Sequence, residues 1–162
     1  MSEYSKEMAN YVKSWGLPEC LAGIKEDIIF KFDDNNLCDT NKQGYRCEKN
    51  NVKFCLYNTK LKKVLFSMDF QRINRCAFKD PIPRVQLHLI YTHIDAFRRK
   101  GIASYYISKL IEYAICQNAK CISLTANADV DNNYNALEQN ELELFYEKRS
   151  TDDMPIIFYA SR

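Results

Sequence analysis

Hydrophobic and polar positions follow two different periods along this chain, and the change of period predicts where helices and strands lie. Over residues 4–15, apolar side chains recur every three or four positions, which is the spacing of one helix face: Tyr4, Met8, Tyr11, Val12 and Trp15. Gly16 and Pro18 are expected to end this first helix.

Shorter apolar runs predict three strands in the next part of the chain. They cover residues 25–32, 52–57 and 63–69, and the last two form a hairpin around the turn at 58–62. The polar stretch 33–51 between the first two strands is interpreted as a long loop. Pro81 and Pro83 exclude a regular helix before the following strand.

The central part of the chain predicts a strand, a long helix and a second strand. Residues 85–93 are almost continuously apolar, which indicates a strand buried on both faces. The helix, residues 102–117, carries two adjacent apolar rows: Ile102, Tyr106 and Leu110 in one, and Ile107, Ile111 and Ile115 in the other. The short apolar run 120–126 completes a βαβ crossover, so strands 85–93 and 120–126 should be parallel.

Beyond this crossover we expect a polar loop at 127–135, a helix at 137–148 and a last strand at 155–160. The whole order predicts an α/β fold with a central mixed sheet. The length of 162 residues fits one domain, residues 1–162, with the helix at 4–15 as an addition to its core.

Composition narrows the class of protein. The net charge of +2 comes from 23 basic and 21 acidic side chains, which does not favour nucleic-acid binding. No apolar run is long enough to span a membrane, and the polar start has no apolar signal segment. We therefore expect a cytoplasmic protein that binds neither nucleic acid nor membrane.

The cysteines give no indication of a metal site. None of the seven forms a C-x-x-C pair, so no bound metal is predicted; they lie at positions 20, 38, 47, 55, 76, 116 and 121. An odd number of cysteines, several of them in apolar runs, favours reduced and buried thiols.

One segment has the chemistry of an anion site. The basic residues Arg98, Arg99 and Lys100 and the single Gly101 directly precede the predicted long helix. The first turn of a helix presents unpaired N–H groups and partial positive charge, and glycine allows a phosphate to come close. A basic surface loop before a helix is the alternative interpretation. The spacing matches neither a P-loop nor a dinucleotide fingerprint.

Two motifs in this half of the chain resemble a known family. The segment FRRKGIASYYISKLIEYA resembles motif A of the GNAT acetyltransferases, whose signature is Arg/Gln-x-x-Gly-x-Gly/Ala, with Arg98, Gly101 and Ala103 at the specified places. The segment ELELFYEK at 141–148 resembles motif B. The resemblance covers about residues 85–148 and implies the GNAT fold, with splayed parallel strands 85–93 and 120–126 and helices on both faces of the sheet.

The resemblance also implies a cosubstrate, acetyl-CoA, and residues that bind it. Its pyrophosphate would rest on the loop from Arg98 to Ser104, and its pantetheine arm would lie along the preceding strand. Further contacts would come from the region of motif B. The implied cofactor-binding residues are Tyr91, Thr92, His93, Arg98, Arg99, Lys100, Gly101, Ile102, Ala103, Ser104, Asn127, Gln139 and Asn140.

The implied activity is transfer of the acetyl group to an amine by direct attack on the thioester. Tyr146 would be the general acid that reprotonates the thiolate, and a backbone N–H near His93 would polarise the carbonyl. Alternatively, Tyr146 packs into the core beside Phe145. Motif B usually continues into Gly-Phe, but Arg149, Ser150 and Thr151 follow here, so the last strand is expected to be short or missing.

The general base stays open at this stage. The candidates are a water relay and the side chains of His88, His93, Asp69, Asp95 and Glu138. In the family register His88 would point away from the site, where a histidine packed in the core is the commoner case. Similarly, Glu138, Glu141, Glu143 and Glu147 would either attract a cationic acceptor or form a solvated helix face.

The expected partners are acetyl-CoA and an amine acceptor, which could be a small molecule or a protein amine. The chain is expected to be a monomer or a homodimer. Two other functions remain open: a GNAT-fold module that binds CoA without turnover, and an RNA-binding αβ domain.

Overall fold

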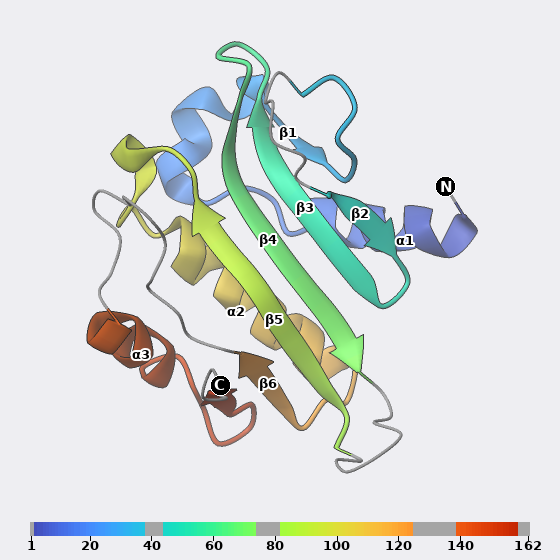
Figure 1. Ribbon diagram of the computed structural model, residues 1–162, viewed down its shortest axis with the longest axis vertical. Coiled ribbons are helices and arrows are strands. Elements are labelled where there is room, and N and C mark those ends of the chain that lie inside the picture. The colour runs from blue at the N-terminus through green and yellow to red at the C-terminus, as the bar shows by residue number, and fades with distance from the viewer. Residues whose placement is uncertain (1, 38–43, 74–81, 125–138, 159–162) are drawn as a thin grey trace.

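The computed structural model describes residues 2–37, 44–73, 82–124 and 139–158. Their strands form one seven-stranded sheet in the order β1-β3-β4-β5-β6-β7, with β2 paired to β3 (Figure 1). The strands are β1 (Ile28–Lys31), β2 (Arg46–Glu48), β3 (Asn51–Asn58), β4 (Lys63–Ile73), β5 (Arg84–Thr92), β6 (Cys121–Leu124) and β7 (Ile156–Phe158). The helices are α1 (Glu3–Lys13), α2 (Ile102–Cys116) and α3 (Gln139–Glu147), with 3₁₀ helices η1 (Glu19–Asp27) and η2 (Asp95–Phe97).

The first half of the sheet is antiparallel. The predicted hairpin is confirmed as β3 and β4, and Asn58 shapes its turn by accepting hydrogen bonds from the N–H groups of Lys60 and Leu61. Two predictions here were wrong. Residues 25–27 belong to η1, so the first strand begins only at Ile28, and the predicted loop 33–51 contains the strand β2. β2 escaped prediction because only Cys47 among its three residues is buried.

The second half of the sheet is parallel, as predicted. Arg84–Leu87 of β5 pairs with Cys121–Leu124 of β6, and β6 pairs with the three-residue strand β7. Helix α2 connects β5 to β6 and ends within one residue of its predicted end. The mixed sheet with helices confirms the predicted fold class, while the continuation of β6 after Leu124, where splaying was expected, lies outside the described residues.

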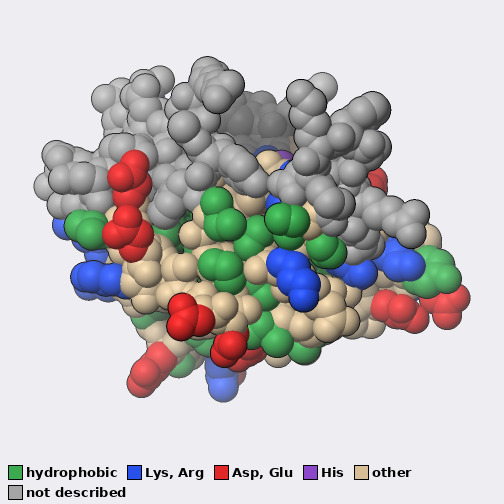
Figure 2. Space-filling model, turned by 90° about the horizontal axis from the view of Figure 1, so that it is seen from below, with side chains coloured by type: hydrophobic (Ala, Val, Ile, Leu, Met, Phe, Trp, Pro, Cys, Tyr) green, Lys and Arg blue, Asp and Glu red, His purple; other side chains and the backbone are tan. Residues whose placement is uncertain are grey.

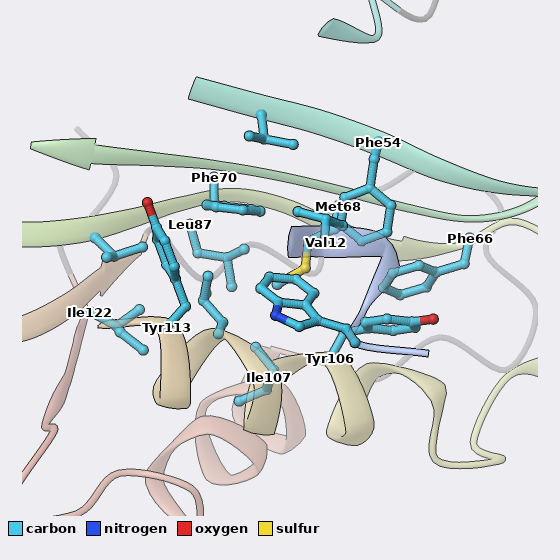
Figure 3. Packing of buried hydrophobic residues seen from close by; sticks show 14 of the residues in the cluster. Val12, Phe54, Phe66, Met68, Phe70, Leu87, Tyr106, Ile107, Tyr113 and Ile122 are labelled. Carbon is cyan, nitrogen blue, oxygen red and sulfur yellow. The ribbon is translucent and has the colours of Figure 1, made fainter. Parts of the chain in front are cut away.

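The core lies between the sheet and the helices α1 and α2. Trp15, which is 5% exposed, contacts rings of β3, β4 and α2: Phe54, Phe70 and Tyr106. Figure 3 labels these three rings within the core. Helix α1 therefore packs on the sheet, through Ala9, Val12 and the Trp15 that follows it. The outer end of its predicted stripe is not buried, because Tyr4 is 60% exposed.

A second, smaller cluster lies apart from this core. It contains Tyr45, Cys55, Tyr57 and Val64, with Leu37 packed against them. All of these residues come from strands β3 and β4 or from the segments around 37 and 45. The described residue packed against this cluster, Leu37, belongs to a loop, while all three helices contribute to the larger cluster.

Burial corrects three further expectations. Strand β5 is not buried on both faces, because His88 is exposed and Leu89 is 36% exposed. Ile115, at the end of the second apolar row of α2, is 50% exposed. Cys47, Cys55 and Cys121 are buried free thiols as expected, but Cys20 and Cys116 are exposed. Cys38 and Cys76 lie outside the described residues.

The described surface shows no continuous basic field on the side drawn in Figure 2. There, lysine and arginine side chains alternate with acidic, apolar and neutral ones. Within the described ranges, no helix is both long and apolar enough to cross a membrane. The same ranges contain no group of three or more His, Cys, Asp or Glu side chains arranged to hold a metal ion.

Candidate functional site: the loop before helix α2

The loop between β5 and α2 has the backbone of a tight, open turn. After η2, Arg98 is extended, whereas Arg99 and Gly101 have φ angles of 61° and 94°. Positive φ is costly for residues with a Cβ, and it explains why a glycine precedes the helix. A Cβ built on Gly101 would meet nothing within 4 Å, so its place is open space. The sequence prediction of a special backbone at Gly101 fits this geometry.

The first turn of α2 presents its amide groups at this opening. Gly101 is the N-cap residue and, lacking a side chain, it cannot cap the helix. The carbonyl of Gly101 accepts from the N–H of Tyr105 at 3.0 Å, and this is the first bond of the helix ladder. The N–H groups of Ile102, Ala103 and Ser104 precede that bond, where a helix leaves its amides without intrahelical partners. Their dipoles favour an anion at this position.

Arg98 anchors the loop to the end of β5. Its Nε donates to the carbonyl of Thr92 at 2.8 Å, and one terminal nitrogen donates to the hydroxyl of Tyr91 at 2.7 Å. The other terminal nitrogen lies 2.5 Å from Asp95, and the side chain is only 8% exposed. We expected Arg98 among the cofactor-binding residues. In the structure, the guanidinium of Arg98 binds other groups of the protein, so this side chain fixes the shape of the loop.

Positive charge at the opening comes from other residues. Arg99 and Lys100 are both exposed on the loop. Arg149, which directly follows motif B, donates to the Ser104 hydroxyl at 2.5 Å and to the Phe145 carbonyl at 2.7 Å. Its guanidinium also lies 3.6 Å from the centre of the Phe145 ring. Partial burial lowers the pKa of Arg149, while the neighbouring Tyr146 acts to raise it. An arginine side chain stays protonated at neutral pH.

Sequence reasoning missed Arg149. It treated the residue only as a departure from the usual Gly-Phe of motif B. No short-range signal marks it, since Ser104 lies 45 positions away along the chain.

Strand β5 contains a β-bulge in its middle, before the strand reaches the loop. Leu89 pairs with Asp69 and Leu87 with Phe70, so His88 is an extra residue opposite β4. Val85 and Leu87 before the bulge are buried, and after it Ile90 packs against the larger core. The bulge thereby changes which residues of β5 face the helices.

The backbone N–H of His93 does not point in the direction expected for polarising the thioester carbonyl. This N–H donates to the carbonyl of Leu65 at 2.8 Å, so it faces β4 and cannot polarise a carbonyl at the other edge. Because backbone groups alternate between the two edges of a strand, those of Thr92 and Ile90 face the β6 side. The bond from Arg98 to the Thr92 carbonyl agrees with this direction.

The side chain of His93 belongs to a polar chain at the end of β5. Its Nε2 lies 2.7 Å from the Ser67 hydroxyl, which lies 2.6 Å from the hydroxyl of Tyr45. The ring of His93 also contacts Tyr91 edge-to-face, with 4.8 Å between ring centres. Three residues at the end of β5 thus lie next to Arg98, as their order in the chain predicted: Tyr91, Thr92 and His93. The contacts described for them are with other groups of the protein.

Tyr146 lies in the larger core and is 3% exposed. Burial raises its pKa, and the nearby Arg149 acts in the opposite direction. Its neighbour Phe145 contacts it edge-to-face, as the packing alternative predicted. The Tyr146 phenol is therefore protonated at neutral pH. Arg149 connects the C-terminal end of α3 to the first turn of α2 through its bonds to Phe145 and Ser104.

For some of the other expected site residues, the structure describes only the backbone or nothing at all. Asn127 and Glu138 lie outside the described residues, and only the backbone of Gln139 and Asn140 is described, at the start of α3. Asp69 pairs with Arg46 at 2.8 Å, and Asp95 pairs with Arg98. Glu143 and Glu147 are exposed.

No family model matches the chain, and no curated protein sequence does. Solved structures that resemble it include a transcriptional regulator from Bacillus halodurans (20% identity, TM-score 0.48), a GNAT family acetyltransferase from Staphylococcus aureus (16%, 0.40) and an aminoglycoside N-acetyltransferase in complex with CoA (16%, 0.40).

The match with the transcriptional regulator covers 64% of this chain and 61% of the regulator. The two shares are 70% and 98% for the Staphylococcus aureus acetyltransferase, and 71% and 69% for the aminoglycoside N-acetyltransferase. The chain spans about three fifths of the length of five of the solved structures that it matches. Because these three TM-scores are all below 0.5, the fold class rests on the strand order and pairing of this chain itself.

Proposed function

We propose that this protein is a GNAT-type N-acetyltransferase that binds acetyl-CoA at the loop before α2. The observation that carries the proposal is the opening formed by Gly101 at φ 94° and the first-turn amides of α2. Arg99, Lys100 and Arg149 add positive charge around it. Amide donors with cationic side chains fit a diphosphate, and the open space beside Gly101 leaves room for it.

The edge of β5 supplies a place for the pantetheine arm. The described ladder with β6 occupies this edge only as far as Leu87. Beyond it, the backbone groups of Ile90 and Thr92 point to the same side. An extended arm with amide groups can pair with them as an added strand does. The N–H of Ile90 would then polarise the thioester carbonyl, the role that was expected near His93.

The chemistry requires an amine to attack the thioester carbonyl and a thiolate to leave. Fixing the two reactants supplies much of the rate, and a backbone donor stabilises the developing oxyanion. Tyr146 would return a proton to the thiolate. The phenol is protonated at neutral pH, as a general acid must be, while the rise of its pKa on burial makes it a weaker proton donor.

Binding and transfer are tested separately. Acetyl-CoA at ~100 times its dissociation constant should stabilise the protein by about 2.7 kcal/mol, seen as a higher melting temperature. The unaltered protein should also release CoA from acetyl-CoA when a panel of primary amines, including polyamines, aminoglycosides and peptides, is supplied. Absence of any stabilisation by CoA or acetyl-CoA would refute the proposal.

Replacing Tyr146 with phenylalanine should lower kcat by about 10²-fold, within the usual range for loss of a general acid. Acetyl-CoA affinity should stay within about twofold, a change worth less than ~0.5 kcal/mol. The measurements are kcat by CoA release and affinity by titration. Tyr113→Phe is the matched control, because Tyr113 is also a buried tyrosine with a raised pKa but belongs to the middle of the core. Equal kcat values for the two variants would assign Tyr146 to packing alone.

A binding module without turnover is the second candidate. The burial of Tyr146 and the motif B departure at Arg149 favour it. It predicts the same stabilisation by acetyl-CoA, with no acetylation of any amine in the panel.

A further inference from the structure

His88 occupies an unusual place in β5. It is the extra residue of the bulge, and its side chain is exposed. A bulge turns two successive residues toward one side of the sheet. The exposure of both His88 and Leu89, between the buried Leu87 and the core-facing Ile90, agrees with this. The expectation of a histidine packed in the core is therefore wrong, and the imidazole is open to solvent and to a second substrate.

Within the described part of the chain, one hydrogen bond orients the imidazole. Its Nε2 lies 3.3 Å from Oε1 of Gln71 on β4. A carboxamide oxygen can only accept a hydrogen bond, so Nε2 carries the proton in this arrangement. In the neutral ring, the lone pair is then on Nδ1. With the Gln71 amide in this orientation, the ring nitrogen that can accept a proton is Nδ1.

The position of His88 along β5 is the second part of the argument. An arm that starts at the loop before α2 runs along β5 from Thr92 toward Arg84. The described ladder with β6 fills that edge up to Leu87, so the arm can pair only beyond this point. His88 lies about 13 Å from Thr92 at the ~3.3 Å rise of a strand residue. The sulfur end of the arm, farthest from the diphosphate, therefore comes next to the bulge.

Three of the other candidates for a base are engaged elsewhere, and Glu138 lies outside the described residues. Asp69 is paired with Arg46, and Asp95 with Arg98. His93 is bonded to Ser67 at the loop end of the strand, near the diphosphate. On the face that carries His88, Asp69 is paired with Arg46, and Glu48 of β2 and Lys53 of β3 lie on the same face.

We propose that His88 is the general base of the transfer reaction and that Gln71 is its positioning residue. The inference rests on the proposed function. The amine nitrogen forms a bond to the thioester carbon, whose carbonyl electrons move to oxygen. Nδ1 of His88 takes the proton from that nitrogen. When the carbonyl re-forms, the C–S bond breaks and its electron pair leaves on sulfur, which takes a proton from Tyr146. The products are an amide and CoA thiol; His88 then releases its extra proton to solvent, and Tyr146 regains a proton from solvent.

The test is chemical rescue of the variant His88→Ala in the full chain. We expect kcat to fall by about 10²-fold, with acetyl-CoA affinity within twofold of the unaltered protein. Added imidazole at fixed pH should restore part of the lost kcat of His88→Ala, in proportion to its concentration. It should not restore Tyr146→Phe. A residue that only supports the fold would give no such rescue.

The positioning role is tested by Gln71→Leu and Gln71→Glu. Gln71→Leu should lower kcat about tenfold without changing acetyl-CoA affinity, whereas Gln71→Glu keeps an acceptor oxygen and should retain most of the activity. If His88→Ala keeps more than half of kcat, or if imidazole gives no rescue, His88 is not the base. If the unaltered protein binds acetyl-CoA but acetylates no amine, both this inference and the proposed activity fail.

Discussion

Replacing Gly101 with alanine is expected to weaken acetyl-CoA binding by 10- to 100-fold, equivalent to ~1.4–2.7 kcal/mol. Gly101 has a φ of 94°, which alanine adopts only with strain, so the loop must relax and turn its amides. The new Cβ would also enter the open space in which we place the diphosphate. The measurement is titration of each variant with acetyl-CoA at constant salt, because exposed charges contribute and are screened.

The chain contains a matched control for this change. Gly44 also has positive φ, at 68°, and a Cβ there would likewise meet nothing within 4 Å. Gly44→Ala should therefore cause a similar loss of folding stability, roughly 1 kcal/mol, without weakening the binding of acetyl-CoA. Equal affinities of the two variants would mean that the turn at Gly101 does not hold the cosubstrate.

The sequence predicted the elements around the site well because their signals are local. Helix α2 and strand β5 have long, periodic apolar patterns, and the parallel pairing of β5 with β6 follows from the helix between them. The need for a special backbone at Gly101 is also local, since a single glycine stands between basic residues and a helix. These features depend on residues within one short stretch of chain.

The features that escaped prediction depend on contacts between distant residues. The bulge at His88 is set by the register of β5 against β4, and periodicity alone gives no sign of an inserted residue. The bulge reverses the facing of the residues after it, and so it exposes His88. Arg149 reaches Ser104 only because α3 ends beside the start of α2. The bonding of the His93 amide to Leu65 likewise follows from β4 and not from the local sequence.

Replacing Trp15 with alanine should lower the free energy of unfolding by ~3–5 kcal/mol, the usual cost of truncating a buried aromatic residue to alanine. Trp15 is 5% exposed and contacts the rings of Phe54, Phe70 and Tyr106, so its loss leaves a cavity at the centre of the core. Because domains are stable by only about 5–15 kcal/mol in total, this change should be visible in urea unfolding followed by far-ultraviolet circular dichroism.

The same substitution connects the core to the proposed site. The carbonyl of Trp15 accepts a hydrogen bond from the hydroxyl of Tyr105, and that of Gly16 accepts one from Tyr106 at 2.9 Å. Both tyrosines belong to the first two turns of α2, directly after the amides that we assign to the diphosphate. Loss of Trp15 should therefore also weaken acetyl-CoA binding, and saturating acetyl-CoA should recover part of the lost stability. Tyr4→Ala, on the exposed side of α1, is the control and should cost less than about 1 kcal/mol. A Trp15→Ala protein as stable as Tyr4→Ala would show that α1 does not hold α2 against the sheet.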